Sequence, residues 1–506
     1  MKHAAALLTL LLAAAPAHAV DAPIKPGKIR LGIDSLPLSF GNPYRTAQIP
    51  SIYVLSALYD GLTRIGVDGT LRPWLATSWE SDDAVTWRFK LRDDVVFADG
   101  TPLTADAYKV AVDYLASDEA LREGLVREIP KLKAARVVDP RTIEITLAEP
   151  DALFPRSAAA LPVAEPKAWT TLGREAFSKT PVGTGPYKIV RFESNKIVLT
   201  ANDKSWRKPK VRDLEIVAIP DVSSRTQALL ANQIDIALGL GPEAMSDITS
   251  EGGQVSATPT AQVYVWSFML QREGKKVDTP LQDARVRRAM TMAVNRQQIV
   301  DTILGGYGKV ASQGATPIVY GYNPDLKPLP YDPGAAKKLL AEAGYPNGFS
   351  MTMLATASAV GAQTQVHQRV ASDLAAVGIQ VEIRTAPVPQ YLNYLSRATF
   401  PTDAFGVTFP ADPNIDAIRP LRIHSCLRRE AFYCDERIMP KIKEALAARD
   451  PATALRLRRE IVAWYHDEAP SIFISEDMRL AGLGASVRGY EDAHGMIAYD
   501  AIDIVK

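Results

Sequence analysis

Histidines, cysteines, serines and paired carboxylates are the side chains that could give this chain a catalytic or metal-binding site. The sequence contains none of the common motifs that arrange such groups, namely G-x-S-x-G, H-E-x-x-H, C-x-x-C and G-x-x-x-x-G-K-[ST]. The histidines that follow residue 19 are scattered, and we expect surface or structural roles for His367, His424, His466 and His494. We therefore predict a protein that is not an enzyme and that has no metal site and no cofactor. The alternative, an exported hydrolase, would need two cleft carboxylates with shifted pKa.

Cysteine chemistry is limited to Cys426 and Cys434, which are eight residues apart. In an exported chain, oxidising conditions favour a local disulfide over two free thiols. We predict this disulfide and expect it to staple a loop. A zinc site is the competing interpretation, but His424 is the only nearby histidine and the spacing fits no common ligand pattern.

The first 19 residues have the three parts of a secretory signal peptide. Met1-Lys2-His3 is a positively charged start, residues 4–15 are apolar, and Ala17-His18-Ala19 is a small-residue cleavage site. Twelve apolar residues are too few to span a bilayer, which needs about 20. No cysteine lies near the cleavage point, and no later segment approaches 18 consecutive apolar residues. We expect a periplasmic protein without a lipid or membrane anchor.

Charge and length restrict the class of partner. The chain has 506 residues, 58 Lys plus Arg against 57 Asp plus Glu, and 47% hydrophobic residues. Nucleic acids and anionic membranes attract proteins with a basic excess, so neither is an expected partner. At about 150 residues per domain, the length suggests roughly three domains.

Strand and helix patterns alternate along the chain, which predicts an α/β fold. Residues 28–33 and 86–92 alternate apolar and polar side chains as half-buried strands do, and Thr104 can cap a following helix. Residues 188–200 resemble a hairpin that turns at Ser194-Asn195. A strand at 214–219, a helix at 223–231 and a strand at 234–237 form one predicted βαβ unit.

The C-terminal half repeats this order more clearly. Asp332-Pro333 begins a helix that Gly344 ends. A strand at 350–354, a helix with Val366, Val370 and Leu374 on one face, and a strand at 379–383 form a second βαβ unit. Two covering helices are expected at about 435–448 and 451–465.

Read together, several strings resemble the bacterial extracellular solute-binding proteins of the peptide, nickel and oligosaccharide class. No single string is specific, but their order spans nearly the whole chain after residue 19. They are Leu58-Tyr59-Asp60-Gly61-Leu62, Pro73 to Trp79, Phe89 to Arg92, Phe97 to Ala105, Pro181 to Tyr187, Ile234 to Ala237, Val286 to Met290, Val294 to Arg296 and Tyr331 to Pro346.

The resemblance implies a two-lobed periplasmic-binding-protein fold with a hinge and an extra domain inserted in the first lobe. The implied divisions are a first lobe of residues 20–44, 181–268 and 480–506, an inserted domain of residues 45–180, and a second lobe of residues 269–479. Such a protein is implied to be a monomer that captures a small-molecule or peptide ligand. It would deliver this ligand to an inner-membrane ABC permease driven by a cytoplasmic ATPase.

The cleft implied by this resemblance directs attention to aromatic and charged residues. Tyr44 and Arg45 lie in an entrance loop, where Arg45 is a candidate carboxylate partner and a solvated loop arginine is the alternative. Tyr264, Trp266 and Phe268 share one strand face, where core packing competes with ligand contact.

Further candidates come from the second lobe. Ser358 lies in a strand-to-helix loop, with a surface loop as the alternative. Residues 406–413 resemble the segment in which peptide-binding members use an acidic residue, placed before an Asp-Pro pair, to hold the ligand's amine. Here Phe409-Pro410 occupies the earlier position, and Asp412 either binds the ligand or is only a turn residue. We predict a short peptide or peptide-like ligand, with an oligosaccharide, an opine or a chelated metal as alternatives.

Overall fold

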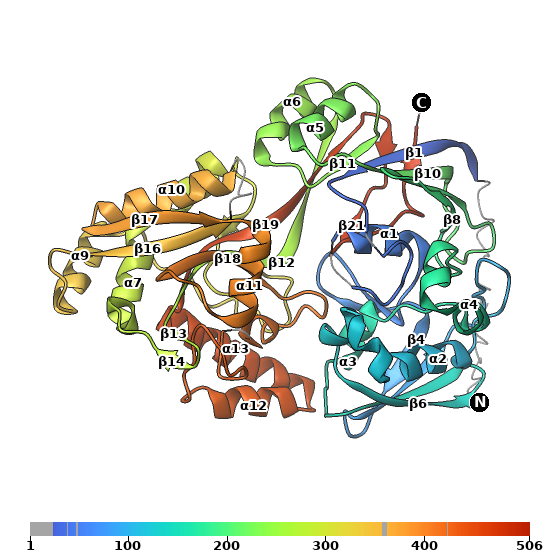
Figure 1. The fold of residues 1–506 in the computed structure, drawn as a ribbon, viewed down its shortest axis with the longest axis horizontal. Coiled ribbons are helices and arrows are strands. Elements are labelled where there is room, and N and C mark those ends of the chain that lie inside the picture. Colours follow the sequence, from blue (N-terminus) through green and yellow to red (C-terminus); the bar gives the residue numbers. More distant parts are fainter. Residues whose placement is uncertain (1–23, 38, 47–48, 357–361, 423, 506) are drawn as a thin grey trace, which may run out of the picture.

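Figure 1 shows two lobes joined by a pair of long strands. The computed structural model describes residues 24–37, 39–46, 49–356, 362–422 and 424–505. The predicted signal peptide lies outside these residues. The long strands are β12 (Gln254–Phe268) and β19 (Ser471–Leu483), which pair antiparallel. β19 also pairs with β11 in the first lobe and β12 pairs with β18 in the second, so the main chain crosses between lobes within one sheet.

The first-lobe half of this sheet is built around β1, whose Ile29, Leu31 and Ile33 are fully buried. β10 and β11 flank β1 and run parallel to it, and α5 connects them, which confirms the predicted βαβ unit. The predicted hairpin is also present as β8 and β9. The strands of this half are β1 (Lys25–Ile33), β8 (Tyr187–Phe192), β9 (Lys196–Ala201), β10 (Val211–Ala218) and β11 (Ile236–Leu238).

A separate antiparallel sheet, β4-β5-β7-β6, lies between residues 76 and 147, inside the predicted inserted domain. The alternation in β5 buries Trp87, Phe89 and Leu91. Thr104 stands at the N-cap of α2, but its hydroxyl donates to Asp106 and caps no backbone amide, which corrects the expected side-chain cap. The elements of this part are α1 (Ser51–Leu58), β2 (Thr63–Ile65), β3 (Leu71–Pro73), β4 (Ala76–Glu80), β5 (Thr86–Leu91), α2 (Ala105–Leu115), β6 (Leu132–Asp139), β7 (Thr142–Leu147), α3 (Phe154–Ser157) and α4 (Pro166–Lys179).

The second lobe contains the other predicted βαβ unit, because β16 and β17 are parallel neighbours joined by α10. Asp332 caps α9 through the amide of Ala335, as the Asp332-Pro333 pair predicts, and Asp450, which also precedes a proline, caps α13 through the amide of Thr453. The helix expected from residue 435 begins later, at Met439, since Asp435 is held in the preceding turn by Arg437. The main elements are α7 (Ala284–Ala293), α8 (Arg296–Gln298), β15 (Lys309–Val310), α9 (Pro333–Glu342), β16 (Phe349–Thr356), α10 (Ala362–Ala375), β17 (Ile379–Ala386), α11 (Val388–Arg397), β18 (Ala404–Pro410), α12 (Met439–Ala447) and α13 (Pro451–Glu468).

Short elements complete the described chain. β13 and β14 form a hairpin in the second lobe, while α5, α6 and the last four short strands belong to the first-lobe side in Figure 1. Their bounds are α5 (Val222–Leu230), α6 (Met245–Ser250), β13 (Gln271–Arg272), β14 (Lys275–Lys276), β20 (Val487–Arg488), β21 (Asp492–Ala493), β22 (Met496–Ile497) and β23 (Asp503–Ile504). No helix among the described residues is both long and apolar enough to cross a membrane.

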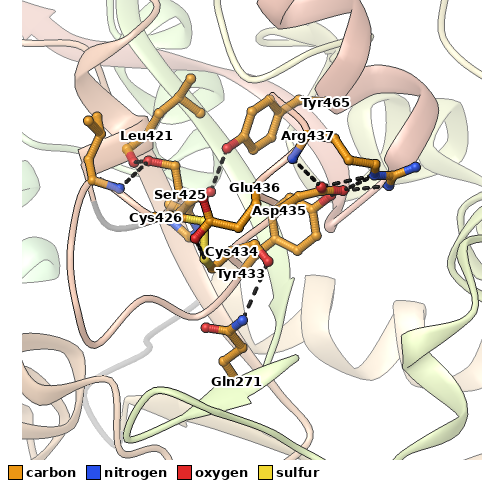
Figure 2. The surroundings of a disulfide bond; sticks show 12 residues. Gln271, Leu421, Ser425, Cys426, Tyr433, Cys434, Asp435, Glu436, Arg437 and Tyr465 are labelled. Atoms are coloured by element: carbon orange, nitrogen blue, oxygen red, sulfur yellow. Dashed lines mark hydrogen bonds and ion pairs between the residues drawn. A yellow bond between two sulfur atoms is a disulfide. The ribbon is translucent and has the colours of Figure 1, made fainter. Parts of the chain in front are cut away.

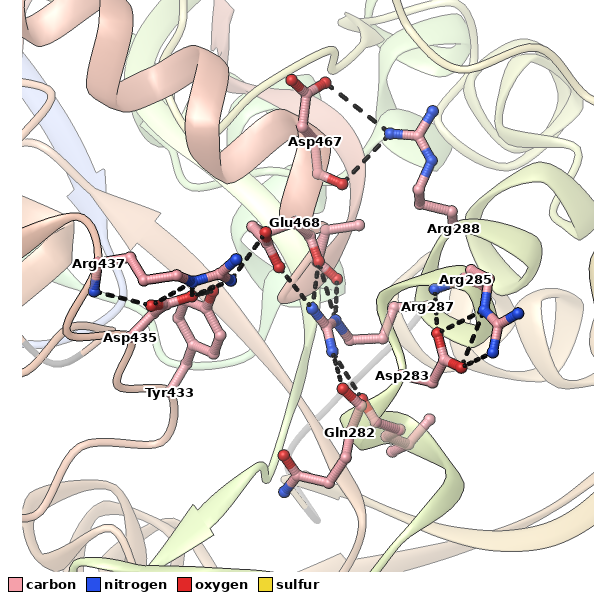
Figure 3. A network of polar contacts seen from close by, with 12 residues as sticks. Gln282, Asp283, Arg285, Arg287, Arg288, Tyr433, Asp435, Arg437, Asp467 and Glu468 are labelled. Carbon is pink, nitrogen blue, oxygen red and sulfur yellow. Dashed lines mark hydrogen bonds and ion pairs between the residues drawn. The ribbon is translucent and has the colours of Figure 1, made fainter. Parts of the chain in front are cut away.

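The start of α7 is fastened to the end of α13 by the buried Arg287 (Figure 3). Arg287 donates from Nη1 to the carbonyl oxygens of Leu281 and Gln282, at 2.8 and 3.0 Å. Its Nε donates to the carbonyl oxygen of Glu468 at 2.9 Å. The last carbonyls of a helix lack partners within the helix, and a cationic donor satisfies them. Arg287 therefore joins the N-terminal end of α7 to the C-terminal end of α13 within the second lobe.

The predicted disulfide between Cys426 and Cys434 is present in the second lobe (Figure 2). Around it, the hydroxyl of Tyr433 donates to Asp435 at 3.2 Å, and Gln271 donates to the carbonyl oxygen of Cys434 at 3.4 Å. The bridge closes the loop of residues 426–434, which is the loop-stapling role expected from the sequence.

Removing this bridge in a Cys426→Ser, Cys434→Ser variant is expected to lower the free energy of unfolding by about 2–3 kcal/mol, because the unfolded chain loses a constraint. Chemical denaturation of both proteins measures the difference. A reducing agent should destabilise the natural chain by a similar amount and leave the variant unchanged. Equal stability of the two proteins without reductant would contradict the expectation.

Candidate ligand-binding site

A cavity of about 670 Å³ lies at the carboxyl ends of the parallel strands, where the two lobes face each other. The first lobe contributes the loops that follow β10 and β11, residues 220–223 and 239–243. The second lobe contributes the start of α10, and the crossing strands contribute Tyr264 and residues 475–478. The carboxyl edge of a parallel sheet is where loops diverge and small ligands bind. The volume is within the range of about 300–1,000 Å³ that is typical of ligand pockets.

Tyr264 is held by a chain of hydrogen bonds in the wall of this cavity. The Nε1 of the buried Trp266 donates to Nδ1 of His367 at 2.9 Å, and Nε2 of His367 lies 2.9 Å from the hydroxyl of Tyr264. An indole N–H can only donate, so Nδ1 is the unprotonated nitrogen of the imidazole and Nε2 carries the proton. Burial lowers the pKa of His367 to about 4, which keeps the ring neutral.

The tautomer of His367 determines which hydrogen bonds the hydroxyl of Tyr264 can make. Because Nε2 of His367 donates, the hydroxyl oxygen of Tyr264 accepts, and the hydroxyl proton is directed elsewhere. Tyr264 is one of the residues that line the cavity, so its hydroxyl is a candidate hydrogen-bond donor to a bound ligand.

Carboxylates are the charged groups of the cavity wall. Asp221, Glu243, Glu476 and Asp477 line it, and none of its described lining residues is a lysine, arginine or histidine. Burial raises the pKa of Glu476 to about 7, an effect that the charge of Lys309 opposes. Burial also raises the pKa of Asp477 to about 6. Both groups thus lie in surroundings that disfavour uncompensated negative charge.

Asp412 lies outside the cavity lining among the described residues, and its carboxylate already has neighbours. Its Oδ2 accepts from Nε2 of Gln262 at 3.1 Å, and its Oδ1 faces Nδ1 of His494 at 3.9 Å. The Nε2 of His494 lies 3.0 Å from the carbonyl oxygen of Gly66, in the N-terminal part of the chain. Asp412 therefore stands at a contact between segments that are far apart in the sequence.

The other predicted ligand residues lie away from this cavity. Tyr44 is buried against the rings of Tyr114 and Trp169, with centroids 5.6 and 4.9 Å away. Arg45 is exposed and donates to the carbonyl oxygen of Arg122 at 2.7 Å.

Three further candidates have the surroundings of core residues. Trp266 and Phe268 are buried in the core of the second lobe, and Phe409 is buried with its ring 4.1 Å from that of His424. Core packing, the alternative considered for the residues of this strand, describes the positions of Trp266 and Phe268, and Phe409 has the surroundings of a core residue as well. Ser358 lies outside the described residues. Among the described candidates, Tyr264 is the one that reaches the cavity.

Comparison with known proteins identifies the family to which this chain belongs. Residues 70–418, more than half of the chain, match the family of bacterial extracellular solute-binding proteins, family 5 Middle. The chain belongs to this family. The resemblance drawn from the sequence strings is confirmed, as is the two-lobed α/β fold.

Relatives of this solute-binding protein match it over most of its length. The glutathione-binding protein GsiB of Escherichia coli (strain K12) is 29% identical over 472 residues, which cover 89% of each chain. The crystal structure of the ABC transporter substrate binding protein CtaP from Listeria monocytogenes has a TM-score of 0.84 at 19% identity, covering 95% of this chain and 99% of its own. The periplasmic murein tripeptide binding protein MppA, in an unliganded open form, has a TM-score of 0.78 at 22% identity and covers 95% and 97%.

Sequence reasoning missed the acidic wall of this solute-binding protein. A signal was present in β19, where Glu476 and Asp477 follow five buried residues of a strand. Adjacent charges inside such a strand are unusual, because burial of a charge without a partner is costly. Asp221 and Glu243 carry no comparable signal, since each stands in a short loop that follows a strand, where a carboxylate is not unusual.

Proposed function

We propose that this solute-binding protein captures a short peptide or peptide-like solute in the periplasm and delivers it to the inner-membrane permease of an ABC importer. The observation that carries the proposal is the cavity between the lobes, walled by both lobes and by the crossing strands. The names of GsiB and MppA, which refer to glutathione and to a murein tripeptide, support a ligand of tripeptide size.

The arrangement of the cavity suits capture by hinge closure. A ligand that contacts both lobes at once stabilises the closed state relative to the open one, and the two crossing strands are the place where bending can occur. The closed shape then distinguishes a loaded protein from an empty one at the permease. No covalent bond changes in this cycle, and a single copy of the chain suffices.

A hydrolase is the second function to consider, because Glu476 and Asp477 both have a raised pKa and line the cavity. Glycosidases place two carboxylates on opposite sides of the bond that they cleave. These two residues are instead neighbours on one strand. Together with membership of a family of binding proteins, this favours capture over cleavage.

Native mass spectrometry of the protein purified from its own periplasm tests the proposal. We expect a bound small molecule that is identified, after gentle release, as a peptide or a peptide conjugate. A bound sugar, opine or metal chelate would overturn the peptide assignment, and a cleaved product would favour the hydrolase. If the protein is empty, a thermal-shift screen of tripeptides follows, and the absence of any shift would count against a peptide ligand.

Replacing Tyr264 by phenylalanine is expected to weaken binding of the released ligand by a factor of about 2 to 13, because one hydrogen bond to the ligand is lost. Isothermal titration calorimetry measures the dissociation constant. Tyr391→Phe is the control, since Tyr391 is a buried tyrosine of the same lobe that donates to the carbonyl oxygen of Gly406 and is not among the described residues that line the cavity. Equal losses in both variants would show that Tyr264 has no specific role.

A further inference from the structure

A second set of contacts joins the two lobes, apart from the crossing strands. On the first-lobe side it consists of the β2–β3 turn and α3, and on the second-lobe side of residues 318–322 and 411–417. Figure 1 places α3 in one lobe and β18 and α13 in the other. These segments form an inter-lobe seam. None of them contributes to the described lining of the cavity, so the seam joins the lobes through protein contacts of its own.

Arg156 of α3 is the polar clamp of this seam. Its side chain is buried, and its Nε donates to the carbonyl oxygen of Asn414 at 2.8 Å. Its Nη2 donates to the carbonyl oxygen of Gly69 at 3.0 Å, within its own lobe, and lies 3.5 Å from that of Ile415 in the other. All three acceptors are main-chain oxygens, so one guanidinium connects the main chains of both lobes.

The clamp is fixed within each lobe. The hydroxyl of Thr63 on β2 donates to the carbonyl oxygen of Pro155 at 2.6 Å, which holds α3 in place. In the second lobe, the amide of Tyr320 donates to the carbonyl oxygen of Ile415 at 2.9 Å. Ile415 has a φ of 55°, a left-handed conformation that β-branched residues rarely adopt. Such strain persists only where the surrounding contacts impose it, and Tyr320 and Arg156 both contact this carbonyl group.

Apolar side chains of both lobes fill the seam beside Arg156. Ile65 and Ala159 of the first lobe are buried in one cluster with Val319 and Ile415 of the second. Leu71 of β3 packs against the same cluster. Parting the lobes would expose these side chains to water, and the hydrophobic effect opposes that exposure.

Gly69 marks a close approach of the two main chains. Its φ is +76°, and a Cβ atom at this position would overlap the carbonyl oxygen of Ile318 and lie 2.8 Å from the carbonyl carbon. Protein interiors are close-packed, and main-chain atoms cannot turn aside as a flexible side chain can. A larger residue at position 69 would therefore push the β2–β3 turn away from the second lobe.

We propose that this seam is a latch that holds the lobes closed in the empty protein, with Arg156 as its clamp and Gly69 at its closest approach. The latch goes beyond the proposed capture function, because it does not depend on which solute binds. It would also affect capture. The apparent dissociation constant of a ligand that binds the closed state is the intrinsic one divided by the closed fraction, so a latch tightens binding.

Single-molecule fluorescence energy transfer on the ligand-free protein tests the latch. Dyes are attached to cysteines that replace Val138 of β6 and Lys443 of α12, which are exposed and lie in different lobes in Figure 1. Cys426 and Cys434 are joined in a disulfide and leave no thiol for the dyes. Unfolding and refolding without reductant removes any bound solute. We expect the open state to hold at most about 10% of the molecules. A mainly open protein would overturn the latch.

Gly69→Ala is expected to make the open state the larger population, because its methyl group overlaps the main chain of Ile318. Gly252→Ala is the matched control, since Gly252 has a similar φ of +79° and nothing lies within 4 Å of its Cβ position. Both variants carry the same kind of backbone strain, and only the first carries the clash. A closed population as large in Gly69→Ala as in the control would contradict the latch.

Arg156→Leu provides a second variant that leaves the β2–β3 turn unchanged. We expect the ratio of open to closed molecules to rise by about tenfold to a hundredfold, the loss typical of a hydrogen bond from a charged group. Arg191→Leu is the control, because Arg191 is an exposed first-lobe residue paired with Glu193. Circular dichroism verifies that each variant is folded. The same ratio in both arginine variants would overturn the role of the clamp.

The latch and the capture function fail separately, because the populations are measured without a ligand. A natural chain that is closed when empty and opens in both seam variants, yet binds no peptide, would retain the latch and overturn the peptide ligand. A natural chain that is open when empty and binds a tripeptide would retain capture and overturn the latch.

Discussion

Replacing Asp60 by alanine is expected to lower the free energy of unfolding by about 3–5 kcal/mol, which is the usual cost of removing one partner from a buried ion pair. Oδ1 of Asp60 accepts from Nε and Nη2 of Arg207 at 3.0 and 2.7 Å and from Nε1 of Trp74 at 2.8 Å. Its Oδ2 accepts from Thr184 and Trp206 at 2.8 and 3.1 Å. The alanine variant would leave four donor side chains without this acceptor.

Chemical denaturation followed by circular dichroism measures this loss. The matched control is Asp203→Ala, because Asp203 pairs with Arg212 at a similar distance, 2.7 Å, but the carboxylate is 60% exposed. Exposed pairs contribute little, and we expect the control to lose no more than about 1 kcal/mol. A comparable loss in both variants would mean that burial of the Asp60 pair adds nothing to its effect.

We expect low pH to weaken the ion pair between Asp60 and Arg207. Burial alone would raise the pKa of Asp60, but the charge of Arg207 and the hydrogen bonds from Trp74, Thr184 and Trp206 outweigh it and hold the pKa below its ordinary value. The stabilisation is therefore complete above the unfolded pKa of about 4 and is lost as the pH falls through the folded pKa. The difference in stability between the natural chain and the Asp60→Ala variant should shrink in acid.

Much of the fold could be predicted because its strands and caps are encoded locally. Ile29, Leu31 and Ile33 alternate, and the structure buries all three in β1. Asp332 and Asp450 stand before prolines and cap their helices. The start of α12 was misplaced because Asp435 and Arg437 use a local ion pair, which the helical periodicity of the apolar residues does not reveal.

The site was harder to predict, because its wall is assembled from segments that only the topology brings together. Tyr264 and Glu476 are more than 200 residues apart, yet their strands pair directly in the large sheet. The aromatic character of a residue did not by itself predict that it lines the cavity. Trp266 shares a strand face with Tyr264, but its ring is fully buried and it reaches the cavity only through His367.

Arg458 and Asp416 form a second buried ion pair, for which we expect strongly non-additive substitutions. Nε and Nη2 of Arg458 donate to the two carboxylate oxygens of Asp416 at 2.7 and 3.1 Å, and Nη1 donates to the carbonyl oxygens of Ala445 and Ala454. Asp416→Leu alone would leave the guanidinium buried without its counterion, at a cost of about 3–5 kcal/mol.

A double-mutant cycle with Arg458→Met measures the coupling between the two residues. The Asp416→Leu, Arg458→Met variant has no buried charge at this place, so we expect it to recover most of the stability lost by either single variant. Additive losses would contradict this and would mean that the two side chains act independently.

The result also bears on ligand capture, because Asp416 lies four residues after Asp412, in the segment that follows β18. Arg458 on α13 holds that segment against the helices of the second lobe, so a variant that keeps its stability but loses the ion pair would show whether this anchoring is needed for binding.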